Sequence, residues 1–192
     1  TLTRAPLDSH PDLAPHGAAE ARLFALGAGT AAINLDDAFG RELAARLPAG
    51  TRLLGVTLAG ASSATLSGAL VTLGADGLVL DLQSAGASAR LRSPLWGRFN
   101  AENLLVAAGI LVGSGLPLER VTDALGQCTA PPGRMERVPG TPAQPAVLVD
   151  FAHTPDALRK ALAAVREHCA GEVWCAPLRA SGSAASRMAT PP

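Results

Sequence analysis

The sequence contains a single lysine, Lys160, among its sixteen Lys and Arg residues. Lys160 lies inside a predicted helix, and no glycine-rich loop precedes it. A phosphate-binding loop of the pattern G-x-x-x-x-G-K-[ST] requires a lysine directly after its last glycine, so these 192 residues contain no such loop. Nucleotide chemistry would therefore need a loop from outside this sequence.

Other features that define protein classes are also scarce. The three cysteines (128, 169 and 175) are odd in number and lack metal-type spacing, which is typical of a reduced, cytoplasmic chain. No apolar run reaches the roughly 18 residues of a membrane span, and TLTRAPLDSH has no signal-peptide layout. Sixteen acidic residues balance the sixteen basic ones, so we expect neither nucleic acid nor a membrane as partner. The chain begins with Thr1 rather than Met, which suggests a fragment.

The residues that are present predict a globular α/β chain, since 48% of them are hydrophobic. Two apolar runs separated by Gly74-Ala75-Asp76-Gly77 predict a β-hairpin. Asn100 and Pro117 are each positioned to begin a helix, and Leu105, Ile110, Leu118, Val121 and Leu125 are expected to pack between the two helices. The other predicted strands are 30–34, 53–58 and 89–92.

The segment 147–175 predicts a strand, a helix and a second strand. Val147 to Val149 reads as a buried strand, Thr154 and Pro155 begin a helix, and a further strand covers 173–175. Such βαβ units bind ligands at the carboxyl ends of their strands, where Asp150 and His153 lie. The alternative, that both residues only cap the turn, fits the pattern equally well.

A second pair of polar residues begins the predicted helix at position 100. Asn100 and Asn103 both fall in its first turn, and a carboxamide offers the donor and acceptor that the N6/N7 edge of adenine requires. Two capping asparagines are the more common explanation of an isolated N-x-x-N. The Pro- and Gly-rich stretch 129–145, which carries Arg134, predicts a domain boundary near 130–145.

Taken together and in order, these segments resemble the Mur ligases, and among them the E-type enzymes. The resemblance is carried by LWGRFNAENLL (95–105), PPGRMERV (131–138), VDFAHTPDAL (149–158) and HCAGEVWC (168–175), with INLDDAFGR (33–41) and TLTRAPLDSH (1–10) in the same register. It covers about residues 1–175. Folylpolyglutamate and cyanophycin synthetases share the architecture, so they are related families that the resemblance also allows.

The resemblance implies an α/β fold. Residues 1–130 correspond to the later part of the Mur ligase central ATP-binding domain, and 131–145 to a linker. Residues 146–175 correspond to the start of a Rossmann-like C-terminal domain. The remaining polar stretch, 176–192, departs from the family, and we expect a disordered tail of the kind that a frameshift produces.

The resemblance also implies a reaction, its ligands and a site. ATP, with Mg²⁺, phosphorylates the D-glutamate of UDP-MurNAc-L-Ala-D-Glu, and the amine of diaminopimelate or lysine attacks the acyl phosphate in cytoplasmic peptidoglycan synthesis. Asn100 and Asn103 would face adenine, with Phe99 packing nearby. Arg134 and Asp150 would hold the ribose and phosphate region, and His153 would lie near the phosphates.

The sequence differs from the family at positions where the family binds its metal ion. Pro6 occupies the place of a metal-binding histidine, and Glu20 that of a carbamylated lysine. We assign no metal ligand and no catalytic residue. The alternative function is therefore a catalytically inactive, truncated or frameshifted remnant with at most residual nucleotide binding. A third hypothesis is an active ligase of the folylpolyglutamate type.

Overall fold

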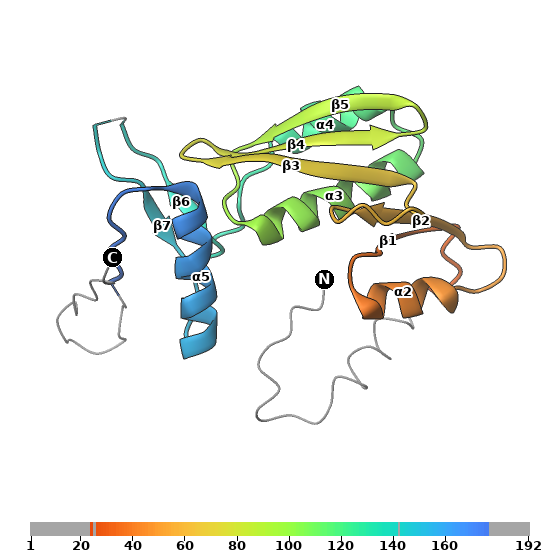
Figure 1. The fold of residues 1–192 in the computed structure, drawn as a ribbon, viewed down its shortest axis with the longest axis horizontal. Helices are drawn as coiled ribbons and strands as arrows, with labels where there is room; N and C mark the ends of the chain where they lie inside the picture. Colours follow the sequence, from red (N-terminus) through yellow and green to blue (C-terminus); the bar gives the residue numbers. More distant parts are fainter. Residues whose placement is uncertain (1–23, 25, 142, 177–192) are drawn as a thin grey trace.

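A computed structural model describes residues 24, 26–141 and 143–176, which contain a five-stranded and a two-stranded sheet (Figure 1). The large sheet has the order β1-β2-β3-β4-β5, and β6 pairs with β7. Within these residues, no helix is long and apolar enough to cross a membrane. The elements in chain order are β1 (Thr30–Asn34), α2 (Ala38–Ala45), β2 (Arg52–Thr57), β3 (Leu66–Gly74), β4 (Gly77–Ser84), β5 (Ala87–Ser93), α3 (Arg98–Gly113), α4 (Leu118–Gly126), β6 (Glu136–Val138), β7 (Val147–Val149) and α5 (Pro155–His168).

The large sheet is parallel at one side and antiparallel at the other. β1, β2 and β3 run parallel, whereas β3, β4 and β5 are antiparallel neighbours. The predicted hairpin is confirmed, and its turn requires glycine at position 77. Gly77 has a φ of +115°, and a Cβ atom there would lie 2.0 Å from the carbonyl oxygen of Ser93.

Helices pack on both faces of the parallel part, so the mixed α/β class is confirmed. Ala31 and Ile33 of β1 are buried in a cluster with residues of α2. Leu54 and Val56 of β2 are buried in the main core, which includes α3 and α4. Gly109 brings α3 close to this surface, because a Cβ there would lie 2.7 Å from Val56 Cγ1.

Two details of the predicted helix pair are wrong. α3 begins at Arg98 with Gly97 as its N-cap, so Asn100 lies within the helix rather than capping it. Ile110, expected in the core, is 55% exposed. It lies five residues after the buried Leu105, which places it about 140° further round the helix and away from the sheet.

Leu105→Ala and Ile110→Ala form a matched test of this packing. Loss of the Leu105 side chain, which is 1% exposed, is expected to lower the free energy of unfolding by about 2–5 kcal/mol through lost transfer energy and a cavity. Loss of the exposed Ile110 side chain is expected to cost less than about 1 kcal/mol. Urea unfolding followed by circular dichroism measures both, and equal losses would contradict the arrangement.

The predicted buried strand 147–149 is a strand, but it is not buried. β7 pairs antiparallel with β6, which lies inside the predicted linker 131–145, and Val147 and Val149 are 51% and 43% exposed. Residues 173–175 form no strand. A βαβ unit needs two neighbouring parallel strands, and within the described residues β7 has only β6 beside it. The predicted βαβ unit is therefore absent here.

The start of the last helix is confirmed. The Thr154 hydroxyl accepts a hydrogen bond from the backbone N–H of Ala157 at 3.2 Å, with Pro155 in the first turn and Asp156 near the positive end of the helix dipole. The buried face of α5 includes Ala164 and His168, and it packs on a small cluster rather than on a parallel sheet.

Candidate functional site

The first two turns of α3 carry three of the predicted site residues. Asn103 is the sixth residue of the helix, so it lies in the second turn and not in the first turn as predicted. Asn100 Nδ2 donates to the carbonyl oxygen of Trp96 at 2.7 Å, and Asn103 Nδ2 donates to Asn100 Oδ1 at 3.3 Å. Asn103 is exposed, Asn100 is half-buried and Phe99 is 41% exposed. The two carboxamides thus lie three residues apart on one face of the helix, joined to each other.

Gly97, just before α3, has a conformation that a side chain would disturb. Its φ is +92°, and a Cβ atom there would lie 2.5 Å from the Phe99 ring. Phe99 therefore lies directly over the N-cap of α3. The aromatic ring and the asparagine pair are held at the same end of the helix.

Glu102 lies at the same end of α3 but on a different face. Burial raises the pKa of its carboxyl, and the charges of Asp36 and Asp37 act in the same direction, whereas Arg98 lowers it. Glu102 follows Asn100 by two residues, which places it about 200° further round the helix. It is separate from the face that carries Asn100 and Asn103, and we exclude it from the candidate site.

A second group of site residues lies where two loops are joined. Asp150 follows β7, and its carboxylate accepts from the backbone N–H groups of Met135 and Ala152, both at 2.9 Å. The backbone N–H of Phe151 donates to the carbonyl oxygen of Gly133 at 2.8 Å. These bonds fix the loop that carries Arg134 against the loop that follows β7. Asp150 stays exposed, so its remaining lone pairs face solvent.

Arg134 and His153 project from these joined loops. Both side chains are exposed, and His153 Nδ1 lies 2.9 Å from the carbonyl oxygen of Phe151. Phe151 is 74% exposed, and its ring covers Gly133, whose φ is +68°. Sequence reasoning did not single out Phe151. The signal in the sequence that could have indicated Phe151 is its position directly after Asp150, the aspartate that follows the strand.

A buried cluster connects the two groups of residues. Trp96, which precedes α3, packs with Met135 of the loop and Ala164 of α5. Asn100 bonds to Trp96, and Asp150 bonds to Met135. Within the described residues, no hydrogen bond joins either asparagine directly to Asp150. The residues that anchor the two groups, Trp96 and Met135, therefore pack in one cluster. The exposed side chains of both groups extend from it.

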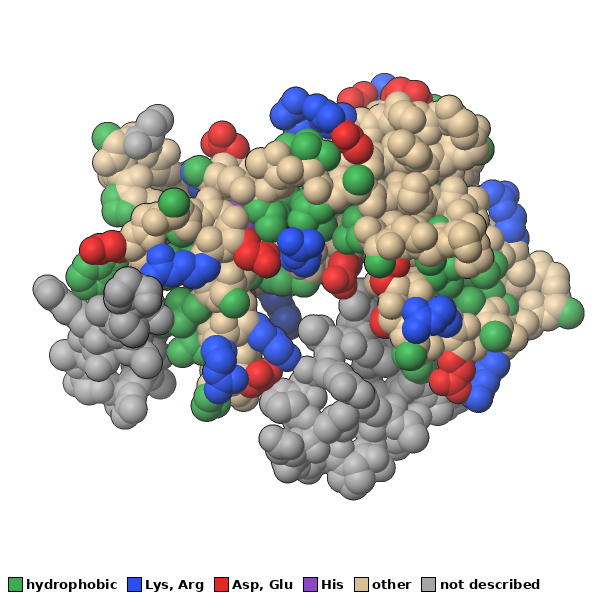
Figure 2. Space-filling model, in the orientation of Figure 1, with side chains coloured by type: hydrophobic (Ala, Val, Ile, Leu, Met, Phe, Trp, Pro, Cys, Tyr) green, Lys and Arg blue, Asp and Glu red, His purple; other side chains and the backbone are tan. Residues whose placement is uncertain are grey.

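Three elements meet beside this cluster. α5 stands next to the first turn of α3 and the tip of the β3–β4 hairpin (Figure 1). Figure 2 shows a hollow in the visible face between the part that carries α5 and the part that carries α2, with basic and acidic side chains interspersed around it.

Trp96 provides a test of the cluster. Its indole N–H is buried and has no hydrogen-bond partner among the described residues. Trp96→Phe removes this unpaired donor but leaves a small cavity, so we expect a change in unfolding free energy within about 1 kcal/mol. Trp96→Ala is expected to cost about 3–5 kcal/mol. Urea titration of each variant measures its free energy of unfolding. If Trp96→Phe were as unstable as Trp96→Ala, the Trp96 indole N–H would not be an unpaired buried donor.

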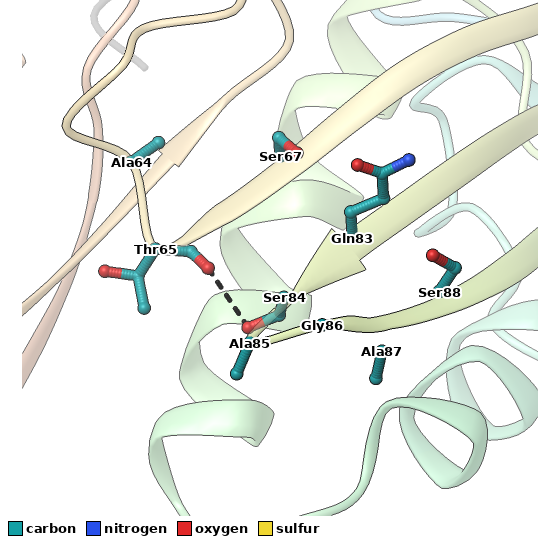
Figure 3. Close-up of a pocket in the computed structure, with 9 residues that line it drawn as sticks. All are labelled: Ala64, Thr65, Ser67, Gln83, Ser84, Ala85, Gly86, Ala87 and Ser88. Carbon is teal, nitrogen blue, oxygen red and sulfur yellow. Dashed lines mark hydrogen bonds between the residues drawn. The ribbon is translucent and has the colours of Figure 1, made fainter.

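A separate surface hollow of about 360 Å³ lies at the turn between β4 and β5 (Figure 3). Small side chains line it, and Ser84 donates to the carbonyl oxygen of Thr65. It contains none of the predicted site residues. Its polar groups are hydroxyls and one carboxamide, without a charged side chain. We do not assign a function to it.

The residues predicted to replace metal ligands, Pro6 and Glu20, lie outside the described residues, as does the predicted tail from position 177 onward. Within the described ranges, no group of three or more His, Cys, Asp or Glu side chains could hold a metal ion.

Comparison with protein families gives two matches along the chain. The description "Mur ligase middle domain" applies to residues 1–111, and "Mur ligase, glutamate ligase domain" applies to residues 133–182. The first match alone covers more than half of the 192 residues. The site residues are divided between the two, because Phe99, Asn100 and Asn103 lie in the first match and the loop residues in the second.

Several curated proteins that resemble the chain share one name, UDP-N-acetylmuramoyl-L-alanyl-D-glutamate--2,6-diaminopimelate ligase. The protein from Alkalilimnicola ehrlichii is 46% identical over 175 residues, covering 90% of this chain and 35% of that protein. The protein from Pseudomonas aeruginosa is 43% identical, covering 91% and 35%. The chain thus spans about a third of the length of the curated relatives it matches.

Solved structures give the same fold. A structure of a UDP-N-acetylmuramoyl-L-alanyl-D-glutamate--2,6-diaminopimelate ligase aligns with a TM-score of 0.72 and 31% identity, over 92% of this chain and 37% of that one. The folylpolyglutamate synthase of Thermotoga maritima aligns with a TM-score of 0.52 and 19% identity, over 70% and 29%. The second likeness concerns the fold alone.

Proposed function

This chain belongs to the Mur ligase family, and from that premise we propose that it is part of an E-type ligase. The proposed reaction is the ATP-dependent addition of the third amino acid to UDP-MurNAc-L-Ala-D-Glu in cytoplasmic peptidoglycan synthesis. The name that the 40–46% identical relatives share favours diaminopimelate over lysine as the amino acid.

The observation that carries the proposal is the joined pair Asn100 and Asn103. Because Asn100 donates to the Trp96 carbonyl, its amide orientation is fixed, and Asn100 Oδ1 then receives one N–H of Asn103. Asn103 retains its second N–H and its oxygen. These match adenine N7 and the N6 amino group, and Phe99 offers an exposed aromatic surface beside the base.

The loop residues suit the rest of the nucleotide. Asp150 has two lone pairs occupied by backbone N–H groups and others directed to solvent, which can accept from ribose hydroxyls. Arg134 is exposed beside it and can contact phosphate oxygens, with His153 nearby. In the proposed reaction the D-glutamate carboxylate displaces ADP from the γ-phosphorus. The incoming amine then attacks the acyl phosphate, and phosphate leaves the tetrahedral intermediate.

These 192 residues by themselves fit nucleotide binding better than turnover. No glycine-rich phosphate-binding loop occurs in the sequence, and Pro6 and Glu20 replace the metal ligands of the family. We therefore derive no step through Mg²⁺. The alternative for this chain is a catalytically inactive remnant with at most residual nucleotide binding.

We further propose that the chain divides into 1–130, a connecting segment 131–145 and the start of a second domain at 146. The two family matches, 1–111 and 133–182, support a division into two domains, and the second match includes residues 133–145 of the connecting segment. β6 lies within the connecting segment, so this segment is partly ordered by pairing with β7.

The direct test is a competition between ATP and GTP for this chain, measured by calorimetry. Guanine presents acceptors at both O6 and N7, so the carboxamide oxygen of Asn103 would face another acceptor. We expect ATP to bind at least about tenfold more tightly, since a mismatched bidentate pair costs about 1–3 kcal/mol. Equal affinities would contradict the adenine site. Phosphate release with the UDP-dipeptide and diaminopimelate would separate an active ligase from the remnant.

A further inference from the structure

His168, at the end of α5, is a buried side chain with a partner on each ring nitrogen. It is 5% exposed. The backbone N–H of Gly97 donates to its Nε2 at 2.8 Å, and its Nδ1 lies 2.8 Å from the carbonyl oxygen of Gly74. Its ring stacks on Trp96 with centroids 4.6 Å apart and planes 11° apart. The side chain therefore touches the start of α3 and the β3–β4 turn together.

This arrangement specifies one form of the imidazole. A ring nitrogen that accepts from Gly97 carries no proton, so Nδ1 carries it and donates to Gly74. The resulting neutral ring satisfies both backbone groups. It also supplies a partner for the N-cap N–H of α3, which has no side-chain cap of its own.

The contact joins parts of the chain that are far apart in sequence. His168 lies in the region matched by the glutamate ligase domain, whereas Gly74 and Gly97 lie in the region matched by the middle domain. The contact to Gly97 spans 71 residues. A second link runs in parallel, because Arg98 Nε lies 3.7 Å from Glu167 Oε1. That exposed pair is weak, so the buried imidazole is the stronger connection.

We propose that His168 is a positioning residue for the adenine nucleotide. By holding the Gly97 N–H it fixes the N-terminal end of α3, which carries Phe99 and the asparagine pair, relative to α5. Because α5 also packs on Met135, whose N–H is bonded to Asp150, the same contact fixes the adenine side of the site relative to the ribose side. This role rests on the proposed function.

Two substitutions separate positioning from simple packing. The amide of His168→Gln reaches the place of Nε2 and keeps an acceptor for Gly97, whereas the amide of His168→Asn reaches the place of Nδ1 and keeps only the bond to Gly74. Val165→Ala is the control, because Val165 packs on the same cluster from the same helix. Hydrogen exchange of the Gly97 amide and calorimetric titration with ATP are measured on the 192-residue chain and each variant.

We expect His168→Asn to speed exchange at Gly97 and to weaken ATP binding about tenfold, the effect of one lost hydrogen bond. His168→Gln is expected to keep both properties within about threefold, and Val165→Ala to leave the ATP affinity unchanged. Equal losses in the Gln and Asn variants, a loss in Val165→Ala as large as that in the Asn variant, or unfolding of both His168 variants would overturn the proposal.

The outcome for the wild-type chain separates this inference from the proposed function. A wild-type chain that binds no ATP refutes the nucleotide site and with it the positioning role. A wild-type chain that binds ATP while its Gly97 amide is unprotected refutes the positioning role alone.

Discussion

Asn103→Ala is expected to weaken ATP binding by about tenfold to a hundredfold and to remove the preference for ATP over GTP. In the proposed site Asn103 provides both the donor to adenine N7 and the acceptor for the N6 amino group. A bidentate contact of this kind contributes about 1–3 kcal/mol to base discrimination, and 1.4 kcal/mol corresponds to a tenfold change in affinity. Calorimetric titration with the two nucleotides measures both effects.

Gln127→Ala is the matched control for this result. Gln127 also carries a carboxamide at the end of a helix, where its Nε2 donates to the carbonyl oxygen of Asp123 at 3.2 Å, but it lies at the C-cap of α4. Its removal is expected to leave the ATP affinity unchanged. If both variants bound ATP as the wild-type chain does, Asn103 would not contact the base.

Asp150→Ala is expected to act on stability and on ligand binding together. Loss of the acceptor for Met135 and Ala152 releases the loop that carries Arg134, and we expect about 1–2 kcal/mol lower free energy of unfolding. The wild-type chain is expected to bind ATP more tightly than 2′,3′-dideoxy-ATP, because Asp150 accepts from the ribose hydroxyls. The Ala variant should bind both nucleotides equally.

Asp156→Ala serves as the comparison for Asp150. Asp156 also lies in the segment after β7, where it pairs with Lys160 and Arg159 on the surface of α5. Surface pairs of this kind contribute little, so a change below about 1 kcal/mol and an unaltered preference for ATP over its dideoxy analogue are expected. If the Asp150→Ala variant still bound ATP more tightly than 2′,3′-dideoxy-ATP, the Asp150 carboxylate would not contact the ribose.

The features that sequence predicted well depend on residues close together in the chain. The strand Thr30–Asn34 and the hairpin with its Gly77 turn are specified by apolar alternation and turn chemistry. The Thr154 cap is equally local, since the hydroxyl bonds to an N–H three residues away. Such signals can be read without knowing what packs on the element.

The features that sequence missed depend on distant partners. Gly97 replaces Asn100 as the N-cap of α3, and its N–H is satisfied by His168 rather than by a nearby side chain. The predicted βαβ unit needed a neighbouring parallel strand that the described residues do not supply, so β7 pairs with β6 instead. Periodicity indicates which face of an element is apolar but not which partner covers it.

The candidate site shows the same division. The residue types of the asparagine pair, Arg134, Asp150 and His153 were recognisable from sequence through the family resemblance. Their supporting contacts were not, because the bonds from Asp150 to Met135 and from Asn100 to Trp96 depend on the folded backbone. The roles of these residues in binding a nucleotide remain predictions.

We propose that the N-terminal end of α3 and the loop after β7 hold one nucleoside between them. A crystal structure of this chain with a non-hydrolysable ATP analogue tests it most directly. We expect adenine within hydrogen-bond distance of Asn103 and ribose hydroxyls within hydrogen-bond distance of Asp150 on the same ligand. A bound nucleotide that contacts only one of these two residues, or neither, would contradict it.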